Sequence, residues 1–312
     1  MLESPLERGA RRAECVKNIR RWSSKRANPN STVLPRIIST VVLWTIVLSS
    51  LYFFGAHAAV VLATLLATLT LHEFYGLTRN MGARPFHGMG LFLSVVMMAG
   101  PYYLAYYTEE IDVLSSVTSG LLVVALLISC IRVLRERDNT NRVETIAATI
   151  GGLLYIPYLL HFLVRILMRE AESGENLALC LWVVAVAKFC DVGALLTGLA
   201  IGRHKMAPQI SPKKTWEGAV GGVLTSAGLG ASIAFFFSDR LPVSLTPLVA
   251  ALLAVPLAIV AIISDLLESV IKRRAATKDT GQLIPGIGGA FDLTDSLILT
   301  APVAYFIFLF LE

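Results

Sequence analysis

Long apolar runs separated by short polar segments dominate the chain. Each run approaches the roughly 20 residues that a helix needs to cross about 30 Å of hydrocarbon. They occupy residues 33–54, 57–78, 88–107, 113–131, 146–168, 177–201, 216–237, 244–268 and 294–311. The pattern therefore predicts an all-α polytopic membrane protein with about nine transmembrane helices.

The composition agrees with this pattern. The 312 residues are 55% hydrophobic, whereas soluble domains are usually about 45–50% apolar even with glycine counted. We expect three regions: a basic N-terminal arm over 1–32, N-terminal transmembrane helices over 33–175, and a C-terminal transmembrane region over 176–312. The last region holds the polar loops with the candidate chemistry, and no soluble domain is expected.

The basic residues predict an orientation. All but four of the 27 Lys and Arg lie within residues 1–36 or in loops on one side of the predicted spans. The exceptions are Arg165, Arg169, Lys188 and Arg240. Because cytoplasmic loops carry the excess of Lys and Arg, we expect the N-terminus in the cytoplasm and the C-terminus on the opposite side. The arm itself is either a simple topology signal or a segment attracted to anionic lipid headgroups.

The most informative polar segment is 264–296. On the helix that precedes its loop, Asp265, Glu268, Ser269 and Lys272 are spaced i, i+3, i+4 and i+7, so they share one face. One interpretation is an ion-pair stripe that helps the helix to end at water. The other is an active site at a membrane face, because charge at the end of a membrane helix is costly unless it is paired, binds an ion or meets a substrate.

The loop and the following helix favour the second interpretation. Residues 278–289 are rich in glycine, and such a backbone can turn N–H groups toward an anion. Asp292 and Asp295 begin the next span, and one of them could cap that helix. Two aspartates that face Asp265 would repel unless a cation lay between them. Carboxylate oxygens suit Mg²⁺, and the candidate ligands are Asp265, Asp279, Asp292 and Asp295.

A second polar cluster lies at 188–217. Lys188 and Asp191 share a helix face, and a buried ion pair is one interpretation of them. The segment 211–218 places two lysines and two hydroxyls just before a helix, a combination that favours phosphate. An ordinary cytoplasmic loop is the alternative, and the order of a Walker A loop is absent. His72 and Glu73 also lie within an apolar run, where an acid is a functional candidate, but the sequence does not place them near either cluster.

These motifs resemble a known family. Residues 269–295, S-V-I-K-R-R-A-A-T-K-D-T-G-Q-L-I-P-G-I-G-G-A-F-D-L-T-D, are similar to the signature of phosphatidate cytidylyltransferases (CDP-diacylglycerol synthases). The upstream segments D-V-G-A (191–194), G-R-H-K-M-A-P (202–208) and S-P-K-K-T-W-E-G (211–218) resemble the same family in order and spacing. The likeness is strong over about 185–300, and further upstream only the apolar spans match.

The resemblance implies a reaction. CTP and phosphatidic acid would give CDP-diacylglycerol and pyrophosphate in phospholipid biosynthesis, with Mg²⁺ as cofactor; a second, monovalent cation such as K⁺ is left open. The expected catalytic residues are Asp191, Lys214, Asp265, Lys272 and Asp292. The expected substrate-binding residues are Ser211, Lys213, Thr215, Ser269, Arg273, Lys278, Gly288 and Gly289. The resemblance also implies a multi-pass protein of the cell (inner) membrane with its active site toward the cytoplasm. Membrane lipids are expected partners, nucleic acid is not, and a homodimer is left open.

The chain departs from the family pattern at three positions. Ile287 stands where the family usually has His, Leu293 where it usually has Arg, and Val192 where Ser is common. The acids and lysines remain, so we expect an active enzyme with altered nucleotide affinity as one outcome. The alternatives are another CTP-using membrane enzyme, such as a polyprenol kinase or an archaeal-type lipid cytidylyltransferase, a cation transporter, and a non-catalytic paralogue that acts as a scaffold.

Overall fold

The computed structural model describes residues 30–108, 113–135, 141–169, 174–277 and 288–311. Nearly all of these residues are helical, which confirms the all-α polytopic prediction. The helices are α2 (Asn30–Asn80), α3 (His87–Thr108), α4 (Val113–Arg135), α5 (Arg142–Leu153), α6 (Leu159–Leu167), α7 (Glu175–Ile201), α8 (Trp216–Phe236), α9 (Pro247–Arg274) and α10 (Ala290–Leu309). A π-helical turn, η1 (Leu154–Tyr158), joins α5 to α6, and a 3₁₀ turn, η2 (Ser238–Arg240), follows α8. The exception to the all-α prediction is a small antiparallel hairpin, β1 (Lys205–Ala207) and β2 (Ser211–Thr215).

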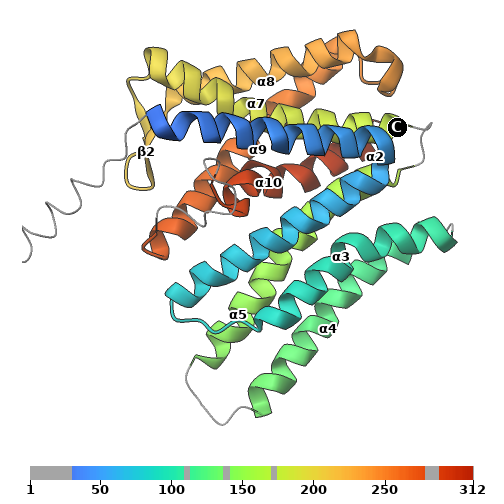
Figure 1. The fold of residues 1–312 in the computed structure, drawn as a ribbon, viewed down its shortest axis with the longest axis vertical. Coiled ribbons are helices and arrows are strands. Elements are labelled where there is room, and N and C mark those ends of the chain that lie inside the picture. The colour runs from blue at the N-terminus through green and yellow to red at the C-terminus, as the bar shows by residue number, and fades with distance from the viewer. Residues whose placement is uncertain (1–29, 109–112, 136–140, 170–173, 278–287, 312) are drawn as a thin grey trace, which may run out of the picture.

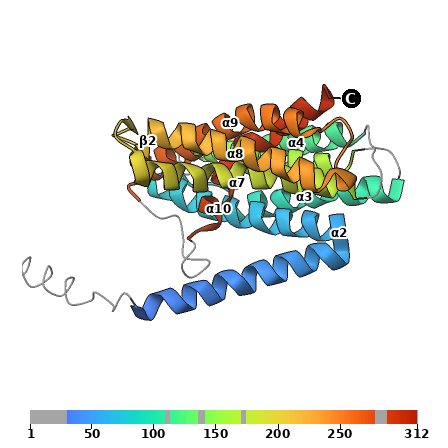
Figure 2. The same ribbon diagram turned by 90° about the horizontal axis from the view of Figure 1, so that it is seen from above.

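The predicted boundary between the first two spans lies at a break within α2. The described residues contain eight helical stretches that are long and apolar enough to cross a membrane. The predicted spans 33–54 and 57–78 are both in α2, whose backbone breaks at Gly55 with φ 53° and ψ −129°. Such a positive φ is easily adopted only by glycine. Figure 2 shows the result as two arms of one helix that meet at a sharp bend, with the first arm at the edge of the molecule. The count of nine spans stays a prediction.

Helix α10 lies at the centre of the fold. It packs on α9, α6, α2 and α7, and so contacts both the N-terminal and the C-terminal helices (Figure 1). Its central residues Ile298, Ala301 and Ala304 are fully buried. The predicted region boundary after residue 175 falls at the first residue of α7, and α10 joins the two regions by packing on both.

Small residues bring α7 and α8 close together. A Cβ atom on Gly222 would lie 2.7 Å from the carbonyl oxygen of Cys190, and one on Gly218 would lie 2.7 Å from that of Ala194. Transmembrane helices associate through such small-residue contacts, because the surrounding lipid is as apolar as their side chains. This close contact places the end of α7 beside the start of α8 and the hairpin between them.

The polar segments gather at one end of the helices. The hairpin, the end of α9 and the start of α10 lie together there, and the C-terminal end of α10 lies at the opposite end (Figure 1). The two segments that the sequence marks as candidate chemistry, 188–217 and 264–296, thus meet in space. The N-in, C-out orientation stays a prediction.

Candidate active site

The hairpin is fixed to the helices on both sides of it. Thr215 ends β2 and caps α8, because its Oγ1 accepts a hydrogen bond from the Gly218 N–H at 3.1 Å. The Glu217 carboxylate accepts N–H groups from Arg203 at 3.1 Å and His204 at 3.2 Å, and it pairs with the His204 imidazole at 2.5 Å. The hairpin is therefore held to the first turn of α8.

A further contact ties the hairpin to α9. The Arg273 Nε, in the last turn of α9, donates a hydrogen bond to the Ile210 carbonyl at 3.1 Å. Alternation along β2 then separates the two neighbouring lysines, since successive side chains of a strand point to opposite faces. Lys213 is exposed, whereas Lys214 is partly buried and its Nζ forms an ion pair with the Asp265 carboxylate of α9.

A second lysine joins α9 to α10. The Lys272 Nζ lies 2.7 Å from Glu268 Oε1, one turn earlier on α9, and 2.7 Å from Asp292 Oδ1 at the start of α10. The other oxygen of Asp292 accepts the Gly289 N–H at 2.9 Å, so this aspartate also caps its own helix. Gly288 has φ +119°, and a Cβ there would lie 2.7 Å from Asp292 Oδ2. The tight turn into α10 therefore requires glycine at 288.

A third lysine joins α7 to α10. The Lys188 Nζ lies 3.0 Å from Asp295 Oδ1 and 3.9 Å from Asp191 Oδ2. The backbone carbonyl of Asp295 also accepts a hydrogen bond from the Ser264 hydroxyl of α9. Three helices thus meet at Asp295, and each of the three lysines holds a carboxylate of α9 or α10.

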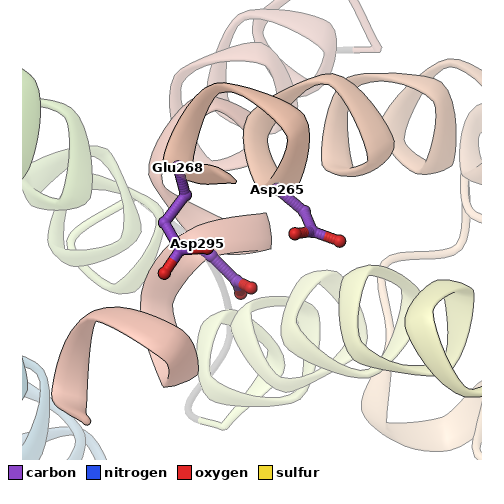
Figure 3. Close-up of side chains that lie close together, drawn as sticks. All are labelled: Asp265, Glu268 and Asp295. Atoms are coloured by element: carbon purple, nitrogen blue, oxygen red, sulfur yellow. The ribbon is translucent and has the colours of Figure 1, made fainter. Parts of the chain in front are cut away.

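Three carboxylates of this cluster converge. Figure 3 shows Asp265 and Glu268 projecting from α9 toward Asp295 on α10, and one oxygen of each lies within 4.8 Å of the others. Glu268 is only 1% exposed. Hard oxygen donors in such a group fit Mg²⁺ or a similar cation.

The charge balance of the cluster also fits a divalent cation. Three lysines, Lys188, Lys214 and Lys272, face five carboxylates, those of Asp191, Asp265, Glu268, Asp292 and Asp295. With every group ionised, two negative charges remain, and one Mg²⁺ would balance them.

The structure brings most of the predicted site residues to this end of the fold. Asp191, Lys214, Asp265, Lys272, Asp292 and Asp295 belong to three groups of ion pairs, and the convergence of Asp265, Glu268 and Asp295 joins these groups into one acid–lysine network. Ser211 lies on the hairpin with the exposed Lys213, and Ser269 is half-buried on α9. Lys278, Asp279 and Ile287 lie outside the described residues. Of the predicted metal ligands, Asp265 and Asp295 belong to the converging group, whereas Asp292 contacts Lys272 and the backbone of its own helix.

Two residues near the network were not assigned a role from the sequence. The sequence places Glu268 on the same helix face as Asp265, but Glu268 is not among the predicted metal ligands. Its spacing of three residues from Asp265 is the signal that could have identified it. Tyr155, in η1, has a buried hydroxyl with no hydrogen-bond partner among the described residues, and its ring centroid is 6.3 Å from that of Phe291. Nothing local in the sequence indicates this position.

A family model described as "Cytidylyltransferase family" matches residues 34–311. The chain belongs to the cytidylyltransferase family. Its relatives include proteins named phosphatidate cytidylyltransferase from three bacteria. The Synechocystis protein is 28% identical over 301 residues, which cover 89% of this chain and 96% of the relative. The Rickettsia bellii protein is 36% identical over 166 residues, which cover 50% of this chain and 67% of the relative. The Haemophilus influenzae protein is 38% identical over 141 residues, which cover 44% of this chain and 48% of the relative. The resemblance drawn from the motifs is confirmed.

Proposed function

We propose that the chain is a membrane nucleotidyltransferase that condenses CTP with phosphatidic acid to give CDP-diacylglycerol and pyrophosphate. The observation that carries this proposal is the network of three lysines and five carboxylates at one end of apolar helices, in a chain of the cytidylyltransferase family. The network offers charge for phosphates, and the surrounding apolar helices would let acyl chains stay in the lipid while the headgroup reaches the network. The reaction of the similarly named relatives fits both features.

The chemistry needs positioning more than a strong base. A phosphate oxygen of phosphatidic acid forms a bond to the α-phosphorus of CTP, the bond from that phosphorus to the β-phosphate bridging oxygen breaks, and pyrophosphate leaves. The attacking oxygen is already anionic at neutral pH, so no proton has to be removed from it. The difficulty is to bring two polyanions together, which cations and fixed geometry relieve.

The lysines are placed for this task. Lys214 lies on a strand tied to both α8 and α9, and Lys272 lies between two acids at 2.7 Å each. Both can exchange a carboxylate partner for a phosphate oxygen when the substrate arrives. Arg273, the next residue along α9, is a further positive charge for the substrate phosphates. Asp191 belongs to the α7 side of the network through its ion pair with Lys188.

The metal site belongs to the same proposal. Asp265, Glu268 and Asp295 would hold Mg²⁺, and a metal bound there would neutralise charge on the CTP phosphates and on the leaving pyrophosphate. Asp292 is the second candidate ligand from the sequence, and its contact with Lys272 makes it an orienter of that lysine as well. A monovalent second cation, such as K⁺, is tested by replacing K⁺ in the assay with a bulky organic cation.

The test is pyrophosphate release by the purified protein in detergent. We expect release that needs CTP, phosphatidic acid and Mg²⁺ together and that stops with EDTA. D265N and E268Q should lose at least the roughly 10–100-fold typical of groups that only support a metal ligand. D239N is the matched control, because Asp239 is an exposed acid in η2 at the far end of α8. Release with a different lipid acceptor but not with phosphatidic acid would overturn the proposed substrate. Full activity of D265N would overturn the proposed metal site.

Orientation and assembly complete the proposal. We expect the site end to face the cytoplasm, where CTP is made, since the basic loops lie at that end. A C-terminal reporter enzyme that is active only outside the cytoplasm should then be active in cells of a bacterial host whose inner membrane receives the protein. A homodimer predicts a protein mass in detergent of twice the chain mass, which light scattering measures.

A further inference from the structure

Glu73 is a buried carboxylate in the N-terminal half of the chain, far along the sequence from the acids of the candidate active site. It lies on α2, about two turns before that helix ends at Asn80, and it is 7% exposed. A carboxylate buried in a membrane helix is costly unless protein groups hydrogen-bond to it. Its partners therefore indicate its role.

Those partners are two backbone groups at the start of α10. The Ala290 N–H donates to Glu73 Oε1 at 3.0 Å, and the Phe291 N–H donates to Glu73 Oε2 at 2.9 Å. The first N–H groups of a helix have no partner within it, and the residue at the N-cap position, Gly289, has no side chain that could accept them. Glu73 thus supplies from another helix the cap that Ser or Asp commonly supplies locally.

Two further contacts join the same faces of α2 and α10. The hydroxyls of Thr70 and Thr294 lie 3.1 Å apart, and the rings of Phe74 and Phe291 meet edge to face with centroids 6.1 Å apart. Thr70, Glu73 and Phe74 are spaced i, i+3 and i+4, so they form one face of α2. Of these three residues, Glu73 is the one whose hydrogen bonds, in the described part of the chain, go to the backbone of the first turn of α10.

That first turn carries the chemistry of the site. Asp292 is the next residue after Phe291, and Asp295 follows one turn later. Both carboxylates pair with lysines of other helices, at 2.7 Å from Lys272 and 3.0 Å from Lys188. Both distances are kept only if the start of α10 holds a fixed position along its axis and a fixed rotation about it, relative to α7 and α9. Both Glu73 oxygens already accept N–H groups, so the carboxylate acts on α10 and leaves substrate contacts to other residues.

We propose that Glu73 is a positioning residue for the nucleotidyl transfer: its carboxylate holds the first turn of α10, and through it Asp292 and Asp295, in the geometry of the acid–lysine network. The inference rests on the proposed function. It assigns a role in the reaction to the N-terminal helices, whose residues contribute no member of that network among the described residues.

The decisive variant is Glu73→Gln in the full-length protein. The glutamine oxygen can accept one N–H group, but its NH₂ group confronts the other, so the cap is half lost with almost no change in size. Thr70→Val is the matched control, because it removes a side-chain hydrogen bond from the same two faces and leaves the cap intact. Two measurements are made on each: hydrogen–deuterium exchange of the amides of 290–292 without substrate, and kcat and KM for CTP and phosphatidic acid.

We expect E73Q to exchange these amides faster than wild type and to lower kcat by about tenfold, a barrier change of about 1.4 kcal/mol, with both KM values within about twofold. T70V should change neither measurement. Normal kcat in E73Q would overturn the inference, and so would equal effects of E73Q and T70V, which would reduce Glu73 to general packing. If E73Q does not accumulate, Glu73→Asp keeps the charge but shortens the reach, and faster exchange with an unchanged kcat in that variant would also overturn it. A wild-type protein that releases no pyrophosphate would instead refute the proposed function, and the exchange measurement would still report on the cap.

Discussion

Lys272 offers a direct test of the acid–lysine network, because it lies between two carboxylates. Its side chain is 15% exposed, and its Nζ lies 2.7 Å from both Glu268 and Asp292. Replacement by Met keeps the length and the apolar stem but removes the charge. In Lys272→Met, Glu268, which is 1% exposed, keeps a buried negative charge without the ammonium group beside it. We therefore expect the variant to be much less stable than wild type.

The magnitude follows from the geometry. Two unit charges 2.7 Å apart attract by about 6 kcal/mol at an effective dielectric constant of about 20. The loss of stability is smaller than this attraction, because the remaining acid can move toward water or take up a proton. Removing one partner of a buried ion pair typically costs about 3–5 kcal/mol. Adding Glu268→Gln removes the unpaired buried charge. The double variant should therefore be about 2 kcal/mol more stable than the sum of the two single effects predicts, which is the interaction energy between the two sites.

The assay is equilibrium unfolding in mixed detergent micelles, in EDTA, for wild type, K272M, E268Q and the double variant. Lys213→Met is the control, because Lys213 is an exposed lysine of the neighbouring strand and its loss should change the free energy of unfolding by less than about 0.5 kcal/mol. Repeating the series in Mg²⁺ should stabilise K272M more than wild type, since the cation replaces the missing positive charge.

Two results would refute this reasoning. If K272M is as stable as K213M, Glu268 is not a buried charge that depends on Lys272. If the double variant shows the simple sum of the single effects, the 2.7 Å contact between the two side chains has no energetic consequence.

Two further predictions concern the framework around the site. Gly222→Val places a side chain 2.7 Å from a backbone carbonyl of α7. It should therefore destabilise the protein by about 1–3 kcal/mol in the same unfolding assay. Gly228→Val is the control and should be nearly neutral, because nothing lies within 4 Å of its Cβ position. Glu217→Gln weakens the anchor of the hairpin at His204 and lets Lys214 move, so kcat/KM for CTP should fall by about three- to tenfold with little loss of stability; an unchanged kcat/KM would contradict the role of the anchor.

The spans could be predicted from the sequence because lipid imposes a simple rule on it. Every backbone polar group in the hydrocarbon must be satisfied within the segment, so a run of about 20 apolar residues has few other structures. The rule says little about where one helix becomes two. Gly55 lies between two apolar runs, and the backbone of α2 breaks there into two helical arms. The hairpin was also missed, since its strands are short and are held by Glu217 and Arg273 from the flanking helices.

Contacts within one helix were predictable, and contacts between helices were not. The face shared by Asp265, Glu268 and Lys272 follows from the helical period alone. The pairing of Lys188 with Asp295 joins residues 107 positions apart, and the cap of α10 by Glu73 joins residues 217 positions apart. Neither leaves a local pattern, so the sequence could mark these residues as costly in a membrane without naming their partners.

The location of the network explains how a membrane protein keeps so many charges. The last turn of α9 carries Lys272, Arg273 and Arg274, and the first turn of α10 carries Asp292. Bases at a helix C-terminus and acids at an N-terminus are both favoured by the helix dipole. Lys272 and Asp292, the two network members at these helix ends, therefore lie where a charge costs the helices least. A substitution in this network changes the stability of the helix ends and the chemistry together, so a loss of activity identifies a catalytic role only when unfolding is measured on the same variant.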